Sequence, residues 1–302
     1  RRSDEVVGRE RELARVRAFL AAPWPRALVV EGPAGIGKAT LVETAVGFAT
    51  EGGVTPIVAR PSLVERDLPH AALLSLLPDE RIEPILPMIA APRRHALEIA
   101  LRRRPALTGE LDTAALGLAV LDVLRAIARP APVLLVVDDL QWCDVPSAGA
   151  LAFALRRAGE APVALLAGVR TGVPSVAVDA IAGALPDGRV ERLLLGPLSL
   201  GAIGRMVAAR TGRARGRSTA ARVAEAAGGN PLIALEIVRA IDASGGDPAP
   251  GVPIAILSSA EPLIAERLGR LSAAADEVVL AVALAGSPTV DLVRHAVGTA
   301  SD

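Results

Sequence analysis

One short run of residues constrains this chain more than any other feature of its sequence. The apolar stretch 27–30 leads into Gly32-Pro33-Ala34-Gly35-Ile36-Gly37-Lys38, and a helical pattern begins at Lys38. Glycines at these positions let backbone N–H groups turn inward without interference from a Cβ atom, so the amides can approach an anion closely. A strand, such a turn and a helix whose N-terminus faces the turn together predict a phosphate-binding loop.

The residues at the end of this loop have separate expected roles. Lys38 would reach the β- and γ-phosphates of a nucleotide as a point charge. The usual pattern continues with Ser or Thr, whose hydroxyl coordinates Mg²⁺, but Ala39 has only a methyl group there. Thr40 lies about 100° further round the helix, so we expect it near the α-phosphate. The alternative is a glycine-rich turn that binds no ligand.

A second apolar run ends in two acidic residues. Residues 133–137 are all aliphatic and lead directly into Asp138 and Asp139. Open α/β sheets bind ligands at the carboxyl ends of their strands, so Asp138 can hold Mg²⁺ and Asp139 can orient an attacking water. An acidic pair at a strand end is also common as a turn or a helix cap. The predicted fold would bring both strand ends to one rim, although Lys38 and Asp139 are about 100 residues apart.

Strand-like and helical patterns alternate over the first 195 residues. The strand-like runs are continuously apolar, which suits a parallel sheet buried on both faces, and the helices between them are typical of βαβ units. We therefore expect an α/β fold over residues 1–195, with a P-loop NTPase parallel sheet as the middle of three layers. The expected strands are 27–30, 54–59, 133–137, 163–169 and 190–195, and the expected helices are 10–22, 38–50, 113–129 and 147–157.

A long insert at about 61–110 separates the second and third expected strands. Prolines interrupt it repeatedly, which predicts short helices and turns. Its arginines could form a nucleic-acid patch, but they flank apolar residues at helical spacing, which favours a solvated helical face. These arginines are Arg93, Arg94, Arg102, Arg103 and Arg104.

Only helical patterns follow after residue 195. Residues 196–245 predict a small all-helical lid domain with helices at 199–210, 218–227 and 231–243. The stretch 244–251 has the composition of a linker, and residues 252–302 predict a further helical segment, with a winged helix as one form of it. Arginines that include Arg205, Arg210 and Arg215 gather in the lid without interleaved aromatic residues. A solvated loop with its flanks is therefore favoured over a nucleic-acid surface.

Composition excludes several classes of protein. The 33 basic and 33 acidic side chains cancel, so no overall field favours nucleic acid or a membrane surface. The single cysteine, Cys143, excludes an internal disulfide and fits a cytoplasmic, reducing compartment, where we expect it to be no nucleophile. No apolar stretch is long enough to span a bilayer, and the charged N-terminus is no signal peptide. The absent initial Met and the final helical pattern lead us to expect a fragment of a longer protein.

Four motifs in the same order resemble those of the STAND-type ATPases, most closely the large ATP-binding bacterial regulators of the LuxR type. The run Asp138-Asp139-Leu140-Gln141-Trp142-Cys143-Asp144 is similar to their Walker B segment. Similar motifs also occur at Val7-Gly8-Arg9-Glu10-Arg11-Glu12-Leu13, in the insert at 67–78, and at Gly228-Gly229-Asn230-Pro231-Leu232. The resemblance spans most of residues 5–245.

This resemblance implies a mechanism. The N-terminal motif would contact the adenine side of ATP or ADP, Pro231 would pack on the base, and Arg170 at a strand end would sense the γ-phosphate. In the resembled family an ADP-bound closed form is the resting state, and exchange for ATP permits self-association. Those regulators bind DNA through a helix-turn-helix domain that we do not find in this sequence. Because Ala39 removes a magnesium ligand, we expect binding first and weak or undetectable hydrolysis.

Two other classes compete with this interpretation. A motor ATPase of the AAA+ kind would have Glu at position 139 and an arginine supplied by a neighbouring subunit, whereas the chain has Asp139. A scaffold without nucleotide, whose helices bind protein partners, would retain the loop only as a relic. Binding of ADP distinguishes the scaffold from the switch.

Overall fold

Five parallel strands form one sheet at the centre of the computed structural model, which describes residues 6–105, 111–186, 188–243, 246, 272–284 and 290. The strands run in the order β2-β3-β4-β1-β5, so β4 separates the strand before the glycine-rich loop from the strand before the acidic pair. The expected parallel sheet is confirmed. Its strands are β1 (Arg26–Gly32), β2 (Thr55–Ala59), β3 (Val133–Val137), β4 (Val163–Arg170) and β5 (Val190–Leu194).

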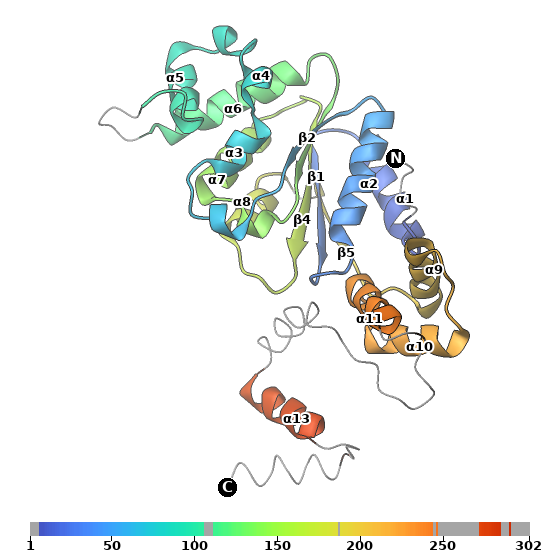
Figure 1. Cartoon of the computed structure of the whole chain (residues 1–302). Coiled ribbons are helices and arrows are strands. Elements are labelled where there is room, and N and C mark those ends of the chain that lie inside the picture. The colour runs from blue at the N-terminus through green and yellow to red at the C-terminus, as the bar shows by residue number, and fades with distance from the viewer. Residues whose placement is uncertain are drawn as a thin grey trace.

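Helices cover both faces of the sheet (Figure 1). Along β3, Leu134 and Val136 pack on the face that carries α1 (Glu10–Ala21) and α2 (Lys38–Glu51). The alternate residues of β3, such as Leu135, pack on the other face. This second face is covered by α3 (Ala71–Leu76), α6 (Thr113–Ile127), α7 (Val145–Arg156) and α8 (Val176–Ala182). All five residues of β3 are buried, which explains its unbroken aliphatic sequence.

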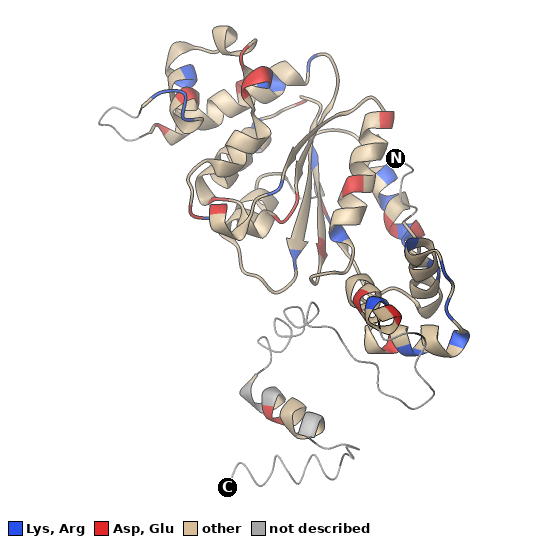
Figure 2. Cartoon of the chain, in the orientation of Figure 1, with Lys and Arg blue, Asp and Glu red and all other residues tan. Residues whose placement is uncertain are grey.

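The insert after β2 consists of short elements, as its prolines predict. It contains η1 (Leu63–Glu65), α3, α4 (Asp79–Ile82), η2 (Leu86–Met88) and α5 (Ala91–Ala100), while its expected last residues, 106–110, lie outside the described part. Its arginines form ion pairs: Arg93 with Asp122, Arg103 with Asp79 and Glu83, and Arg104 with Glu98. Basic and acidic residues accordingly lie close together there (Figure 2).

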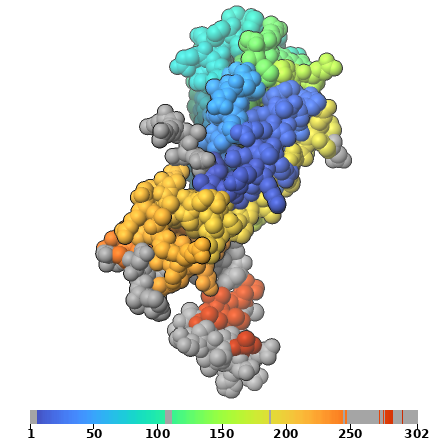
Figure 3. All heavy atoms as spheres, turned by 90° about the vertical axis from the view of Figure 1, so that its right-hand side faces the viewer, coloured from blue at the N-terminus to red at the C-terminus, as the bar shows by residue number. Residues whose placement is uncertain are grey.

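Three helices with their own apolar core follow β5. They are α9 (Leu200–Thr211), α10 (Arg217–Ala226) and α11 (Pro231–Ala243), and Val207, Val223 and Ile237 are among the residues that pack between them. We keep the name lid for residues 196–245. Figure 3 shows the lid, in yellow to orange, directly against the blue N-terminal segment.

Of the expected helical segment 252–302, the structure describes α13 (Ala273–Leu284) and few other residues, so the winged-helix expectation lies outside the described part. Among the described residues, none of the helices combines the length and apolar character needed to cross a membrane.

Candidate functional site

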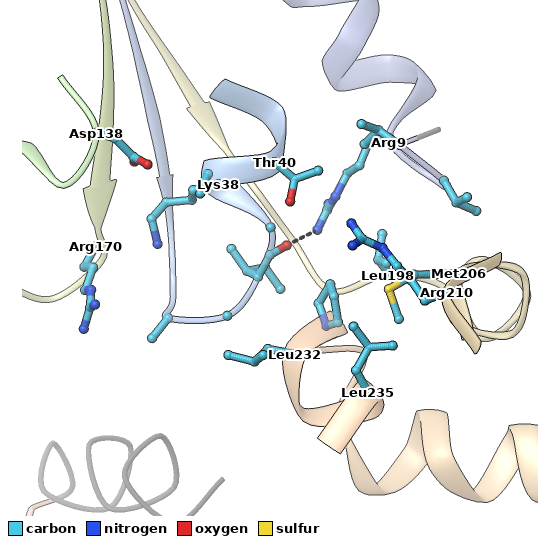
Figure 4. A pocket seen from close by; sticks show the side chains of 18 of the residues that line it. Arg9, Lys38, Thr40, Asp138, Arg170, Leu198, Met206, Arg210, Leu232 and Leu235 are labelled. Carbon is cyan, nitrogen blue, oxygen red and sulfur yellow. Dashed lines mark hydrogen bonds between the residues drawn. The ribbon is translucent and has the colours of Figure 1, made fainter. Parts of the chain in front are cut away.

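A cavity of about 380 Å³ lies where the carboxyl ends of β1, β3 and β4 meet the lid (Figure 4). Its lining is polar at one end, with Lys38, Asp138, Asp139 and Arg170, and includes apolar residues such as Met206 that the lid supplies. It therefore gathers residues that are far apart in the sequence. The predicted site residues that line it are Val7, Arg9, Ala34, Gly35, Ile36, Gly37, Lys38, Ala39, Thr40, Asp138, Asp139, Arg170 and Pro231.

The glycine-rich loop presents a helix N-terminus to this cavity. Gly35 and Gly37 have φ angles of 75° and 103°, which L side chains rarely adopt, and Gly37 is the N-cap of α2. No side chain caps α2, and its N-terminus carries the partial positive charge that favours an anion in the cavity.

Lys38 is buried and anchored to the start of the same loop. Its Nζ donates hydrogen bonds to the carbonyl oxygens of Gly32 at 2.9 Å and Pro33 at 3.1 Å. Gly32 and Pro33 do not line the cavity themselves, but their carbonyl oxygens fix the position of the Lys38 ammonium group, which does. A cation held in this way is ready to pair with phosphate oxygens.

Asp138 lies at the end of β3 in a crowded position. A Cβ atom on Gly168 of β4 would come within 2.4 Å of Asp138 Oδ1, so only glycine leaves room for the carboxylate. Burial raises the pKa of Asp138, the charge of Asp139 raises it further, and Lys38 and Arg60 oppose the rise. A divalent cation would relieve this cost of ionisation.

The donor set fits Mg²⁺ that arrives with nucleotide phosphates. Asp138 and Asp139 supply carboxylates, whereas Ala39 supplies no oxygen, and the described residues contain no cluster of three or more potential metal-binding side chains. Mg²⁺ commonly binds through one or two carboxylates together with substrate phosphates and water.

Arg170 ends β4, which lies between β1, the strand before the glycine-rich loop, and β3, the strand before Asp138. Its Nε lies 3.6 Å from Oδ1 of Asp139, and both side chains are about one-third exposed. The guanidinium is therefore within the cavity and beside the second acid, where planar donors can bind phosphate oxygens.

The N-terminal motif contacts the loop backbone. Arg9 is buried, and its Nη2 donates to the carbonyl oxygen of Ile36 at 3.0 Å while Nη1 pairs with Glu12 at 2.9 Å. Gly8 does not line the cavity. It packs against α9 so closely that a Cβ atom would lie 2.4 Å from Ala202 Cβ. This motif thus joins the loop to the lid.

The lid reaches the loop through Asn230, a contact that the sequence did not reveal. Asn230 is fully buried, and its Nδ2 donates to the carbonyl oxygen of Ala34 at 2.9 Å. Its Oδ1 accepts from the backbone N–H of Leu232 at 3.0 Å, so the same side chain also caps α11. Pro231 begins this helix and lines the cavity.

Further residues of the site were not predicted, among them Val6, Leu198, Leu232 and Leu235 of the cavity lining. Met206 and Arg210 of α9 line the cavity, although arginines of this region were expected to lie only in solvent. Gln141 does not line it but bonds to Asp139. Cys143 is buried, and burial raises its pKa to about 12, which disfavours the reactive thiolate form.

The fold and the loop define this chain as a P-loop NTPase-like protein. Residues 5–166, more than half of the 302-residue chain, match the family described as the AAA ATPase domain, and the chain belongs to that family. Members of this family typically bind ATP or ADP with Mg²⁺.

Solved structures with the same fold differ widely in sequence. A Walker-type ATPase of Pyrococcus abyssi is 14% identical, with a TM-score of 0.58 over 100% of this chain and 86% of that one. The ORC2 protein of Aeropyrum pernix, solved in ADPNP–ADP complexes, is 17% identical, with a TM-score of 0.51 over 97% and 80%. A STAND protein with a tetratricopeptide repeat sensor from Pyrococcus horikoshii is 15% identical, with a TM-score of 0.49 over 96% and 36%. No curated protein matches the chain.

Proposed function

We propose that this chain binds ATP or ADP with Mg²⁺ and serves as the nucleotide-controlled switch module of a transcriptional regulator of the large LuxR type. One observation carries the proposal: a single cavity combines a glycine-rich loop at a helix N-terminus, two acids at a strand end and residues of a helical lid. The apolar lining suits a base, and the polar end suits phosphates and a cation.

The proposal assigns a role to each group. Lys38 and the loop amides bind the phosphates, Thr40 lies near the α-phosphate, and Pro231 packs on adenine. Asp138 holds Mg²⁺ and Asp139 orients water, while Arg170 contacts the γ-phosphate. Support for the role of Arg170 is that it lines the cavity beside Asp139.

Three units would carry the switch: a nucleotide-binding domain at 1–195, the lid at 196–245 and a helical segment at 252–302. ADP would hold the closed form and ATP would open it for self-association, because a ligand shifts an equilibrium only by its different affinity for the two states. Direct contacts of Asn230 and Leu232 with the loop support this coupling, since the lid is bonded to Ala34 and Gly35.

Hydrolysis would be slow in this proposal. Ala39 lines the cavity at the position where a hydroxyl would ligate Mg²⁺. Loss of a charge-assisted contact costs about 1.5–3 kcal/mol, which tight nucleotide binding can tolerate. Turnover depends on Mg²⁺ to neutralise developing charge and is affected more.

Thermal unfolding with and without Mg²⁺-ADP tests the binding. Free ADP at a hundredfold excess over its Kd stabilises the native chain by about 2.7 kcal/mol, which raises the melting temperature. Lys38→Ala, which removes a phosphate ligand, is the matched control and should show little shift. Chromatography of the nucleotide released from denatured protein gives its identity. An unshifted wild-type chain at millimolar ADP would favour the scaffold.

A further inference from the structure

Gln141 is a buried amide whose two ends are both used within the site. It lies in η3 (Leu140–Trp142), directly after the acidic pair, and is 3% exposed. Its Nε2 donates to Asp139 Oδ1 at 2.8 Å, and its Oε1 accepts from the backbone N–H of Arg170 at 3.0 Å. The orientation of the amide follows from its partners, because a carboxylate can only accept and a backbone N–H can only donate.

This amide links the ends of two neighbouring strands. Asp139 follows β3 and Arg170 ends β4, so one side chain fixes the second acid relative to the backbone of the arginine. Asp139 also has a left-handed backbone with φ 59°, a conformation that non-glycine residues seldom adopt. The position of its carboxylate therefore depends on the contacts around it.

Gln141 and Arg170 share one acceptor. Nε of Arg170 lies 3.6 Å from the same Oδ1 of Asp139 that accepts from Gln141. The partial positive charge of the Gln141 amide hydrogen offsets part of the negative charge on this oxygen and so weakens its attraction for a nearby cation. When Arg170 turns toward a phosphate, Gln141 remains as a donor to Asp139.

We propose that Gln141 is a positioning residue that sets the preference of this site between ATP and ADP, by partly satisfying Asp139 and so releasing Arg170 to the γ-phosphate. The inference rests on the proposed nucleotide site. It adds that discrimination between the nucleotides depends on a residue that does not line the cavity.

The test compares the binding of Mg²⁺-ADP and Mg²⁺-ATPγS to the wild-type chain and to two variants by calorimetry. Gln141→Met keeps the length without either polar end. Gln141→Glu keeps the acceptor for Arg170, removes the amide donor and adds a negative charge beside Asp139, which also attracts the Arg170 guanidinium. Without the donor, Asp139 holds Arg170 more tightly. The ratio of Kd for ATPγS to Kd for ADP should rise about tenfold, while Kd for ADP stays within about twofold because ADP has no γ-phosphate.

Ser175→Ala is the matched control. The Ser175 hydroxyl donates to the backbone carbonyl oxygen of Gln141 at 3.5 Å, so its loss disturbs the same turn without touching the amide. In Ser175→Ala, the ratio of Kd for ATPγS to Kd for ADP should equal that of the wild type. If Gln141→Met does not fold, Gln141→Leu, which also lacks both polar ends and adds no charge, carries the test.

Two results overturn the inference alone: an unchanged ratio in the Gln141 variants, or an equal loss of both nucleotides, which would mark a merely structural role. A wild-type chain that binds neither nucleotide overturns the proposed function, and the inference falls with it.

Discussion

Ala39 determines how far a nucleotide site of this kind can act as an enzyme. It lies in the first turn of α2, it is exposed and it lines the cavity, so a larger side chain has room there. We predict that Ala39→Thr raises ATP turnover about tenfold or more, because the new hydroxyl is the missing Mg²⁺ ligand. Ala39→Val has the shape of Thr without its hydroxyl and should stay at the wild-type rate. Phosphate release under saturating Mg²⁺-ATP measures both, and equal rates in the Thr and Val variants would contradict the prediction.

The fold favours the protonated form of Asp138 over its ionised form. Its pKa in the folded chain is raised above 3.8, mainly by burial. The folded state thus binds this proton more tightly than the unfolded chain does, so ionisation of Asp138 lowers stability as the pH rises through the folded-state pKa. We predict that Asp138→Asn raises the melting temperature of the nucleotide-free protein at pH 7 by roughly 2–4 °C.

The gain from Asp138→Asn should disappear below pH 3.8, where the wild-type carboxyl is protonated in both states. Melting curves of the wild type and of Asp138→Asn, from below pH 3.8 to pH 7, show whether the difference in melting temperature has the predicted sign. The same variant should lose the additional stabilisation that Mg²⁺ gives to bound nucleotide, because Asp138 is the proposed ligand. A variant less stable than the wild type at pH 7 would show that the ionised carboxylate is stabilising.

At the scale of elements, the start of α11 joins the lid to the glycine-rich loop. The side chain of Asn230 caps α11, and it also donates a hydrogen bond to the carbonyl oxygen of Ala34 in the loop. We predict that Asn230→Ala lowers stability by about 1–2 kcal/mol through loss of the cap and weakens ADP binding through loss of the loop contact. Asn230→Asp separates the two, since its carboxylate still caps α11 but cannot donate to Ala34.

Chemical denaturation and ADP titration of both Asn230 variants measure the two effects. Asn230→Asp should retain more stability than Asn230→Ala and bind ADP no better than it. If Asn230→Asp binds ADP as the wild type does, the bond from the lid to the loop has no role in the site.

The elements themselves were largely predictable from local patterns. The five aliphatic residues of β3 are typical of a strand buried on both faces, and the acids after them mark its end. Helix α8 was missed, because its seven residues lack a side-chain cap and lie among glycines and prolines. Helix α7 begins at Val145 rather than at the expected residue 147, since Asp144 caps it by accepting from the backbone of Ser147.

The cross-strand contacts of the site were not predictable in this way. Gln141 looks like an ordinary polar residue in a turn, and Asn230 looks like a simple helix cap. Their partners, Arg170 and Ala34, lie 29 and 196 residues away in the sequence. Only the packing of β3 beside β4, and of the lid on the loop, brings these pairs together. Local patterns therefore predict the residues that line the cavity better than the residues that position them.

At the scale of the whole molecule, the proposed switch requires that the γ-phosphate changes how the lid meets the sheet domain. Nε of Arg170 lies 3.6 Å from Oδ1 of Asp139, and a γ-phosphate would compete with this carboxylate for the guanidinium. We predict a single-chain mass with Mg²⁺-ADP and a larger mass with Mg²⁺-ATPγS when size-exclusion chromatography is combined with light scattering. Lys38→Ala should keep the single-chain mass with both nucleotides, because it removes the phosphate contact on which the response depends. Reaching nearly full conversion between two states requires about 10⁴-fold different affinities, so partial conversion that grows with ATPγS concentration still fits the switch. Equal masses with both nucleotides, in a chain that calorimetry shows to bind them, would limit this protein to nucleotide binding without self-association.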